Sequence, residues 1–416
     1  MGRMTTAGLI AVALQGAPVG VDAYDGSTSG PADADVRLVL RSPKALSYLL
    51  TAPSQLGLAR AYVSGELEIH GDPYDALSHI WSDRIGNLSW SERLRILRSV
   101  DPKALRWVDP PAEEYGARRL REGLRHSKAR DAAAISHHYD VSNRFYEWVL
   151  GPSMTYTCAC FPTDDATLEQ AQEHKYDLVA RKLGLQPGMR LLDVGCGWGG
   201  MVRHAAKHYG VQALGVTLSR RQAEWAKEAI ASEGLGHLAE VRFSDYRDVE
   251  EREFDAVSSI GLTEHIGKAN LPSYFTFLAS RLRAGGRLLN HCITRPDNKR
   301  TSTGAFIDRY VFPDGELTGS GTIIASIQDI GMEVRHEENL REHYAKTLAG
   351  WCANLSAHWD EAVAEVGPGR SRVWALYMAG SRYGFETNVV QLHQVLAVKL
   401  DGRGDAHLPL RPWWGG

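Results

Sequence analysis

The residues with the clearest chemical purpose form a glycine-rich turn near the middle of the chain. The stretch Leu191-Leu-Asp-Val-Gly-Cys-Gly-Trp-Gly-Gly200 is an apolar run followed by glycines at positions 195, 197, 199 and 200. A Cβ atom at Gly195, Gly197 or Gly199 would occupy space that a closely approaching ligand needs. A strand that runs into such a turn and then into a helix predicts a nucleotide-type site, and the spacing also fits the dinucleotide fingerprint G-x-G-x-x-G.

The end of the next expected strand helps to separate the kinds of nucleotide site. A dinucleotide site has an acid there for the ribose hydroxyls, about twenty residues after the glycines, but this chain has Gly215-Val-Thr-Leu-Ser219. Thr217 and Ser219 can hydrogen-bond a ligand but carry no carboxylate. Their presence disfavours a nicotinamide dehydrogenase and also departs from the usual pattern of methyltransferases that use S-adenosylmethionine (SAM).

Other residues favour the methyltransferase. An acid at the position of Asp193 lies close to the cationic methionine end of SAM in such enzymes, and Gln222 can take over the ribose contact. Asp245 and Tyr246 follow the third expected strand, where the adenine would lie.

Seven separated blocks of the sequence match one enzyme family in the same order. They are 138–143, 154–158, 191–200, 215–219, 245–248, 264–267 and 291–293. The chain resembles the cyclopropane-fatty-acid synthase family of SAM-dependent methyltransferases, which includes the mycolic acid cyclopropane synthases. The similarity is clearest over residues 137–296 and extends more weakly to about residues 36 and 400.

Within that family, three stretches resemble the actinobacterial branch that makes 10-methylene acyl chains, the precursors of 10-methyl acids such as tuberculostearic acid. They are residues 145–153, 261–264 and 289–296. The resemblance implies that an oleoyl-type chain, carried on a membrane phospholipid, accepts the methyl group. A cyclopropane product and a non-catalytic lipid-binding protein stay open as alternatives.

Methylation of an alkene makes particular demands on a site. An alkene is a weak nucleophile, so the SAM sulfonium must be held in line with the double bond, and methyl transfer leaves a carbocation on the chain. Proton loss from the new methyl with ring closure gives a cyclopropane, whereas a hydride shift followed by proton loss gives an exocyclic methylene. Both routes need water to be excluded and a base that does not trap the cation.

In the family this base is a bound bicarbonate ion, and the resemblance implies which residues hold it here. They are Cys158, Glu264, His291, Ile293 through its backbone, and Tyr344. A bicarbonate hydroxyl can donate to the glutamate while the histidine and the tyrosine donate to its oxygens. Tyr156 and Thr157 align with family residues at the methionine end of the cofactor.

Several of these assignments have a structural alternative. Without the family match, His291 would be an ordinary core histidine and Glu264 a surface residue. Glu147, in the segment that leads to Cys158, is a further catalytic candidate that can bias the cation toward the hydride shift; the alternative is a carboxylate on a helix surface. No metal site is expected, because Cys158 and Cys160 have no second ligand pair at zinc spacing.

The elements that must position these residues alternate between strand and helix from Met189 to about Thr294. Expected strands are 190–194, 211–216, 240–244, 254–260 and 286–294, with helices at 199–209 and 220–232. This order specifies a parallel sheet covered on both faces. The predicted fold class is α/β, a Rossmann-like class I methyltransferase with a doubly wound, mostly parallel sheet, preceded by a small α+β domain.

Four segments are expected along the 416 residues. They are a flexible arm (1–35), a small α+β lipid-associated domain (36–90), a basic helical linker (91–135) and the SAM-dependent methyltransferase domain with acyl-binding insertions (136–416). The linker has six cations between residues 118 and 130. They suit an anionic bilayer surface, and a solvated linker helix is the alternative.

Composition limits the partners. Lys plus Arg (47) against Asp plus Glu (50) leaves no chain-wide basic field, so nucleic acid is not expected. The apolar stretch 7–14 is shorter than the roughly 20 residues that span a bilayer, and five scattered cysteines favour a reducing compartment. We expect a cytoplasmic enzyme, peripheral at the inner face of the membrane.

Two protein partners are also expected. Family members self-associate, which implies a dimer, and a methylene product needs a separate reductase.

Overall fold

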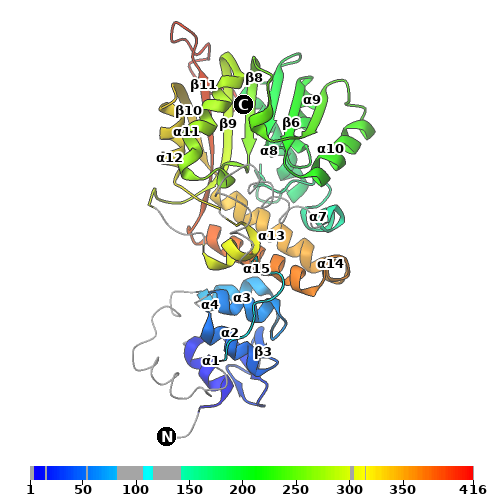
Figure 1. Cartoon of the computed structure of the whole chain (residues 1–416), viewed down its shortest axis with the longest axis vertical. Coiled ribbons are helices and arrows are strands. Elements are labelled where there is room, and N and C mark those ends of the chain that lie inside the picture. Colours follow the sequence, from blue (N-terminus) through cyan, green and yellow to red (C-terminus); the bar gives the residue numbers. More distant parts are fainter. Residues whose placement is uncertain are drawn as a thin grey trace. The chain divides into compact units, whose positions relative to one another are not determined.

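The structure is a computed structural model that forms two compact units (Figure 1). The residues it describes are 4–14, 16–52, 55–81, 106–115, 142–299, 304–313 and 315–415. The larger unit comprises residues 117–303, 312–358 and 384–416, and the smaller unit comprises 1–116, 304–311 and 359–383. Most of the predicted basic linker, including all six cations between 118 and 130, lies outside the described residues.

The larger unit is built on a seven-stranded sheet with the order β10-β11-β9-β8-β5-β6-β7 (Figure 1). The strands are β5 (Arg190–Val194), β6 (Gln212–Thr217), β7 (Ala239–Phe243), β8 (Phe254–Ile260), β9 (Leu282–Thr294), β10 (Met332–Asn339) and β11 (Gln391–Lys399). Neighbours from β9 to β7 are parallel, and β11 is antiparallel to both β9 and β10. The predicted doubly wound, mostly parallel sheet is confirmed.

Helices cover both faces of this sheet. They are α8 (Leu168–Leu183), α9 (Gly200–Tyr209), α10 (Arg220–Ser232), α11 (Leu271–Arg281) and α12 (Ser320–Gln328). Two further helices, α7 (Asn143–Leu150) and α13 (Arg341–Ala357), pack on each other. Leu191 packs with α8, α9 and α10, whereas the next residue, Leu192, packs with α11 and α12. Successive strand residues therefore enter two separate cores, which explains why Leu191 and Leu192 of β5 are both apolar.

Helix α8 has well-defined ends, which matters because it carries side chains into the site described below. The Thr167 hydroxyl accepts from the Gln170 N–H (3.2 Å) and the Gln170 amide oxygen accepts from the Thr167 N–H (2.9 Å), so the two form a capping box. At the other end, Gly184 takes a left-handed conformation with φ +60°, which is the usual way to end a helix.

The smaller unit has a four-stranded sheet with the order β2-β1-β3-β4. Its elements in the first 81 residues are α1 (Thr6–Leu14), β1 (Val19–Ala23), β2 (Thr28–Ser29), β3 (Val36–Leu40), α2 (Pro43–Thr51), α3 (Gln55–Val63), β4 (Leu67–His70) and α4 (Pro73–Trp81). The described part of 1–35, expected as a loose arm, is instead ordered: β1 pairs in parallel with β3, and Val19 and Val21 are buried. Tertiary packing orders this stretch despite its weak local periodicity.

Two segments from later in the sequence also belong to the smaller unit. They contain a π-helical turn (Ile307–Val311), helix α14 (Trp359–Val366) and most of α15 (Pro368–Glu386). Glu114, whose side chain is 3% exposed, accepts two hydrogen bonds from Arg60 (both 2.7 Å), one from Arg309 (2.8 Å) and one from Tyr310 (3.1 Å). This buried carboxylate joins three stretches that are distant in sequence.

No helix within the described ranges combines the length and the apolar character that crossing a membrane requires.

We expect Glu114→Gln to destabilise the smaller unit by about 3–5 kcal/mol, because the buried guanidinium of Arg60 loses its compensating charge. Asp22→Asn is the control, since Asp22 pairs with Arg37 at a partly exposed site and such pairs contribute about 0–1 kcal/mol. Calorimetric unfolding of the full chain measures both. Equal effects of the two substitutions would contradict the role given to Glu114.

Candidate active site

A pocket opens at the carboxyl ends of β5, β6 and β8, the edge at which open α/β sheets bind ligands. Its empty space is about 870 Å³, including the part open to solvent. The structure brings most of the predicted cofactor residues together around it: Tyr156, Thr157, Asp193, Gly195, Gly197, Thr217, Gln222 and Tyr246.

Three predicted cofactor residues are not among those that line this pocket. At Gly199 a Cβ atom would lie 3.2 Å from that of Ala226, so this glycine permits helix packing. Ser219 caps α10 by accepting from a backbone N–H three residues on. Asp245 accepts from the guanidinium of Arg247 at 2.6 and 2.8 Å.

The glycine turn after β5 needs its glycines for two reasons. Gly195 and Gly197 have φ values of +76° and +55°, which side chains rarely adopt. A Cβ at Gly197 would meet nothing within 4 Å, so this backbone faces the open pocket, whereas one at Gly200 would lie 2.1 Å from the Tyr176 hydroxyl oxygen.

Asp193 is buried at the end of β5, where the Ser258 hydroxyl donates to it over 2.6 Å. Burial raises the pKa of this carboxyl to about 6, and the hydrogen bond from Ser258 and the charge of Lys175 act in the opposite direction. A bound cation in the pocket would favour the charged form of Asp193.

Two polar side chains of α8, Gln172 and Lys175, reach the same region and were not singled out from the sequence. The fully buried Lys175 amine donates to the Thr157 hydroxyl (2.9 Å), and Gln172 donates to the Thr157 carbonyl (2.9 Å). Burial lowers the pKa of Lys175 to about 7, against the influence of two cysteines and Asp193. Lys175 and Gln172 lie four and seven positions before the buried Val179, so they share its core-facing side of α8. This spacing could have identified them, because polar residues that face a core require partners.

Glu264 follows β8 in a short 3-10 turn, η5 (Thr263–His265), and contacts the neighbouring strand. The Ile293 N–H donates to its Oε1 atom over 2.6 Å, whereas Oε2 is buried and has no hydrogen-bond partner. Burial raises the pKa of Glu264 to about 7, and the bond from Ile293 opposes this shift.

His291 is fully buried on β9, and its backbone carbonyl accepts from the Gly261 N–H just before η5. Its Nδ1 atom lies 3.1 Å from the Gln394 side-chain nitrogen, whereas Nε2 is buried without a hydrogen-bond partner. Burial, together with Lys175 and Lys182, lowers the pKa of this imidazole well below its ordinary value, so it is neutral.

Cys158 and Tyr344 complete the predicted set of anion-binding positions. The buried Cys158 sulfur lies 3.8 Å from the Leu340 carbonyl oxygen, one turn before Tyr344 along the chain. Burial raises the pKa of the thiol, which therefore stays uncharged. The charge of Lys175 acts to lower the pKa values of both Cys158 and His291.

Aromatic rings connect the pocket to α13. The Trp198 and Tyr146 ring centroids are 4.8 Å apart, Tyr146 and Tyr156 are 5.9 Å apart, and Tyr156 and Trp351 are 5.3 Å apart. Trp198 and Tyr156 line the pocket itself. Ring faces attract cations and exclude water, as the predicted chemistry requires.

One family model, described as mycolic acid cyclopropane synthetase, matches residues 126–395 of this chain. The chain belongs to the mycolic acid cyclopropane synthetase family. A "probable fatty acid methyltransferase" of Mycobacterium tuberculosis is 61% identical to it over 406 residues, 95% of each chain. A "tuberculostearic acid methyltransferase" of the same species is 31% identical over 391 residues, 89% of this chain and 85% of that one.

The solved structures agree with this family assignment. A crystal structure of a mycolic acid cyclopropane synthase complexed with SAH and CTAB is 34% identical, with a TM-score of 0.61 over 64% of this chain and 98% of the other. The family and the fold show that the chain is a SAM-dependent methyltransferase of class I.

The predicted anion-binding residues Cys158, Glu264, His291, Ile293 and Tyr344 are not among those that line the cofactor pocket; Glu264 and Ile293 line a second, smaller pocket, and Glu147 lines neither. Glu147 is on the exposed side of α7, where its Oε1 atom accepts from the Trp225 indole N–H over 3.3 Å. Among the described residues there is also no group of three or more His, Cys, Asp or Glu side chains placed to hold a metal ion.

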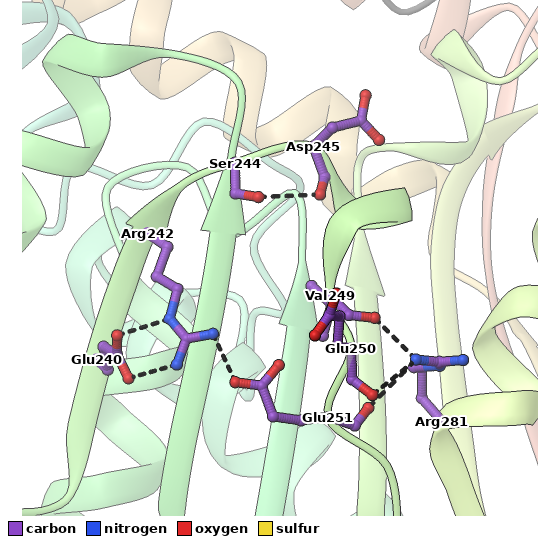
Figure 2. Close-up of polar contacts among 8 residues, drawn as sticks. All are labelled: Glu240, Arg242, Ser244, Asp245, Val249, Glu250, Glu251 and Arg281. Atoms are coloured by element: carbon purple, nitrogen blue, oxygen red, sulfur yellow. Dashed lines mark hydrogen bonds and ion pairs between the residues drawn. The ribbon is translucent and has the colours of Figure 1, made fainter.

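Basic side chains hold the loop after β7 that carries Tyr246 into the methyltransferase pocket (Figure 2). Arg281 donates to the carbonyl oxygen of Val249 (2.8 Å) and to that of the next residue (3.1 Å). Arg242 of β7 donates to Glu251 over 2.6 Å. The far end of the loop is therefore fixed to the sheet and to α11.

We expect Arg281→Met to weaken SAM binding about tenfold, because the loop loses charge-assisted hydrogen bonds of about 1.5 kcal/mol. Arg283→Met is the control, since this neighbour bonds Asp255 away from the loop and should leave the affinity within about twofold. Calorimetric titration with SAM measures both. Unchanged affinity in Arg281→Met would contradict the anchoring role.

We expect Lys175→Met to change how stability depends on pH. The pKa of Lys175 falls from 10.5 to about 7 on folding, so between these values the unfolded chain binds more protons than the folded one. Lys175 therefore makes the wild type gain stability as pH rises through this window, by up to about 1.4 kcal/mol per pH unit. The variant should lack that gain.

Thermal unfolding between pH 7 and 9.5 compares wild type, Lys175→Met and the exposed control Lys207→Met. The stability of the control should rise with pH as that of the wild type does. The stability of Lys175→Met should rise less, so its difference from the wild type should grow with pH. Parallel curves for Lys175→Met and wild type would show that the amine is not buried as described.

Proposed function

We propose that the enzyme transfers the methyl group of SAM to the double bond of an oleoyl-type chain on a membrane phospholipid and yields a 10-methylene chain. The observation that carries this proposal is a pair of buried polar atoms, Glu264 Oε2 and His291 Nε2, that have no hydrogen-bond partner. The names of the relatives, a fatty acid methyltransferase and a tuberculostearic acid methyltransferase, support a fatty acyl acceptor.

The residues suit a reaction that passes through a carbocation. Asp193 at the cofactor pocket provides a carboxyl group for the cationic end of SAM. Buried rings, including those of Trp198 and Tyr146, attract positive charge and offer no strong nucleophile. Cys158 stays a thiol and His291 stays neutral, because burial shifts both pKa values away from the charged forms. These uncharged groups would leave no strong nucleophile beside the cation.

The buried atoms also fit bicarbonate as the base. A bicarbonate ion accepts and donates hydrogen bonds, and the site offers an acceptor at Glu264 Oε2 and an imidazole nitrogen at His291. Cys158 and Tyr344 would complete its surroundings. The Ile293 N–H now donates to Glu264 and would be shared with the ion. Bound there, bicarbonate supplies a weakly nucleophilic base for the proton of the new methyl group.

The remaining partners follow from the same proposal. The cations between residues 118 and 130 would attract the enzyme to anionic phospholipid at the inner face of the membrane. A methylene branch needs a separate reductase to become a methyl branch. Self-association as a dimer would double the basic surface that meets the bilayer.

The test is expression in a host whose phospholipids contain oleate, followed by mass spectrometry of the fatty acid methyl esters. We expect a new species, one carbon longer than oleate, with an exocyclic methylene. A cyclopropane of the same mass would support methyl transfer to the double bond but contradict the proposed methylene product. No new species, from folded protein that binds SAM, would contradict an oleoyl-type acyl acceptor.

Glu264→Gln should lower the yield of this product about 10²-fold or more, because the site loses the acceptor for its base. Glu173→Gln is a matched control, since this carboxylate is exposed on α8. The same assay tests Glu147: a catalytic role predicts that Glu147→Gln lowers the methylene product more than SAM binding, and a surface role predicts no loss.

A further inference from the structure

A row of polar side chains crosses three strands behind His291. In the antiparallel registers, Glu338 of β10 lies opposite Gln394 of β11, and Gln394 lies opposite His291 of β9. Directly opposite residues of antiparallel strands share one face of the sheet. The three strands are neighbours in Figure 1, and α8 supplies a fourth side chain, Lys182, to the same face.

These four side chains form one continuous hydrogen-bonded chain. The Lys182 amine donates to Glu338 and to the Gln394 Oε1 atom (2.7 Å), and the Gln394 Nε2 atom lies 3.1 Å from His291 Nδ1. Lys182, Gln394 and His291 are at most 1% exposed. Water therefore does not compete for these bonds, and each donor must meet an acceptor.

The direction of the chain follows from the ammonium group at its start. An ammonium group only donates, so Lys182 takes the amide oxygen of Gln394 and leaves the amide NH₂ to face His291. The NH₂ group only donates, so His291 Nδ1 must accept. A neutral imidazole has one protonated nitrogen, which leaves the proton on Nε2.

We propose that Gln394, oriented by Lys182, is a positioning residue that holds His291 in the tautomer with its proton on Nε2. Nε2 is the buried atom without a partner, so this tautomer presents a donor to an anion in the site. The opposite tautomer would present a lone pair, which repels an anion and is a better nucleophile toward SAM than an alkene. The consequence for catalysis rests on the proposed function, whereas the tautomer itself does not.

The test is ¹⁵N-histidine NMR of the full chain without substrate, with His291 assigned by the signals that are lost in His291→Asn. In the wild type we expect an unprotonated Nδ1 and a protonated Nε2. Gln394→Glu keeps the size and replaces the NH₂ donor by an acceptor, so it should place a proton on Nδ1. Lys182→Met frees the amide to rotate and should give both tautomers.

Gln391→Glu is the control, because this residue lies on the same strand and bonds Asn388 instead; it should leave the His291 signals unchanged. A wild type with its proton on Nδ1, or unchanged His291 signals in folded Gln394→Glu, would overturn the proposal. For the reaction, Gln394→Glu should lower the product yield about 10–100-fold with SAM affinity within about twofold. If the wild type methylates no lipid, the proposed function fails, whereas the NMR result still decides the tautomer.

Discussion

The structure of the site depends on burying polar side chains at one edge of the sheet, out of contact with water. Burial raises the pKa of Asp193 to about 6 and that of Glu264 to about 7, lowers that of Lys175 to about 7, and keeps His291 neutral. All four shifts are toward the uncharged form. Such burial is costly unless each group has a partner, and among the described residues Glu264 Oε2 and His291 Nε2 have none.

The fold provides those partners from elements that are distant in sequence. Helix α8 contributes Lys175 to the cofactor side and Lys182 to the row behind His291. The antiparallel strand β11, placed between β9 and β10, puts Gln394 directly opposite His291. One helix and one added strand therefore hold side chains both at the cofactor pocket and behind His291.

The sequence predicts the sheet well because its strands are apolar on both faces: the expected strands 190–194 and 254–260 have the bounds observed. The family blocks identify Glu264 and His291 as candidate site residues. Periodicity alone would make Glu264 a surface residue and His291 a core residue. The order within 1–35 and the role of Gln394 were not predictable in this way. Each depends on pairing between distant residues, β1 with β3 and Gln394 with His291, 103 positions apart.

In the proposed reaction, the cation loses a proton from the transferred methyl group and is not trapped by water. The direct measurement uses SAM with a fully deuterated methyl group and an oleoyl phospholipid, and counts the deuterium in the product by mass spectrometry. Two retained deuterium atoms are predicted, for a methylene and for a cyclopropane alike. Three retained deuterium atoms, in a rearranged alkene or in a hydroxylated chain formed by water, would contradict the account.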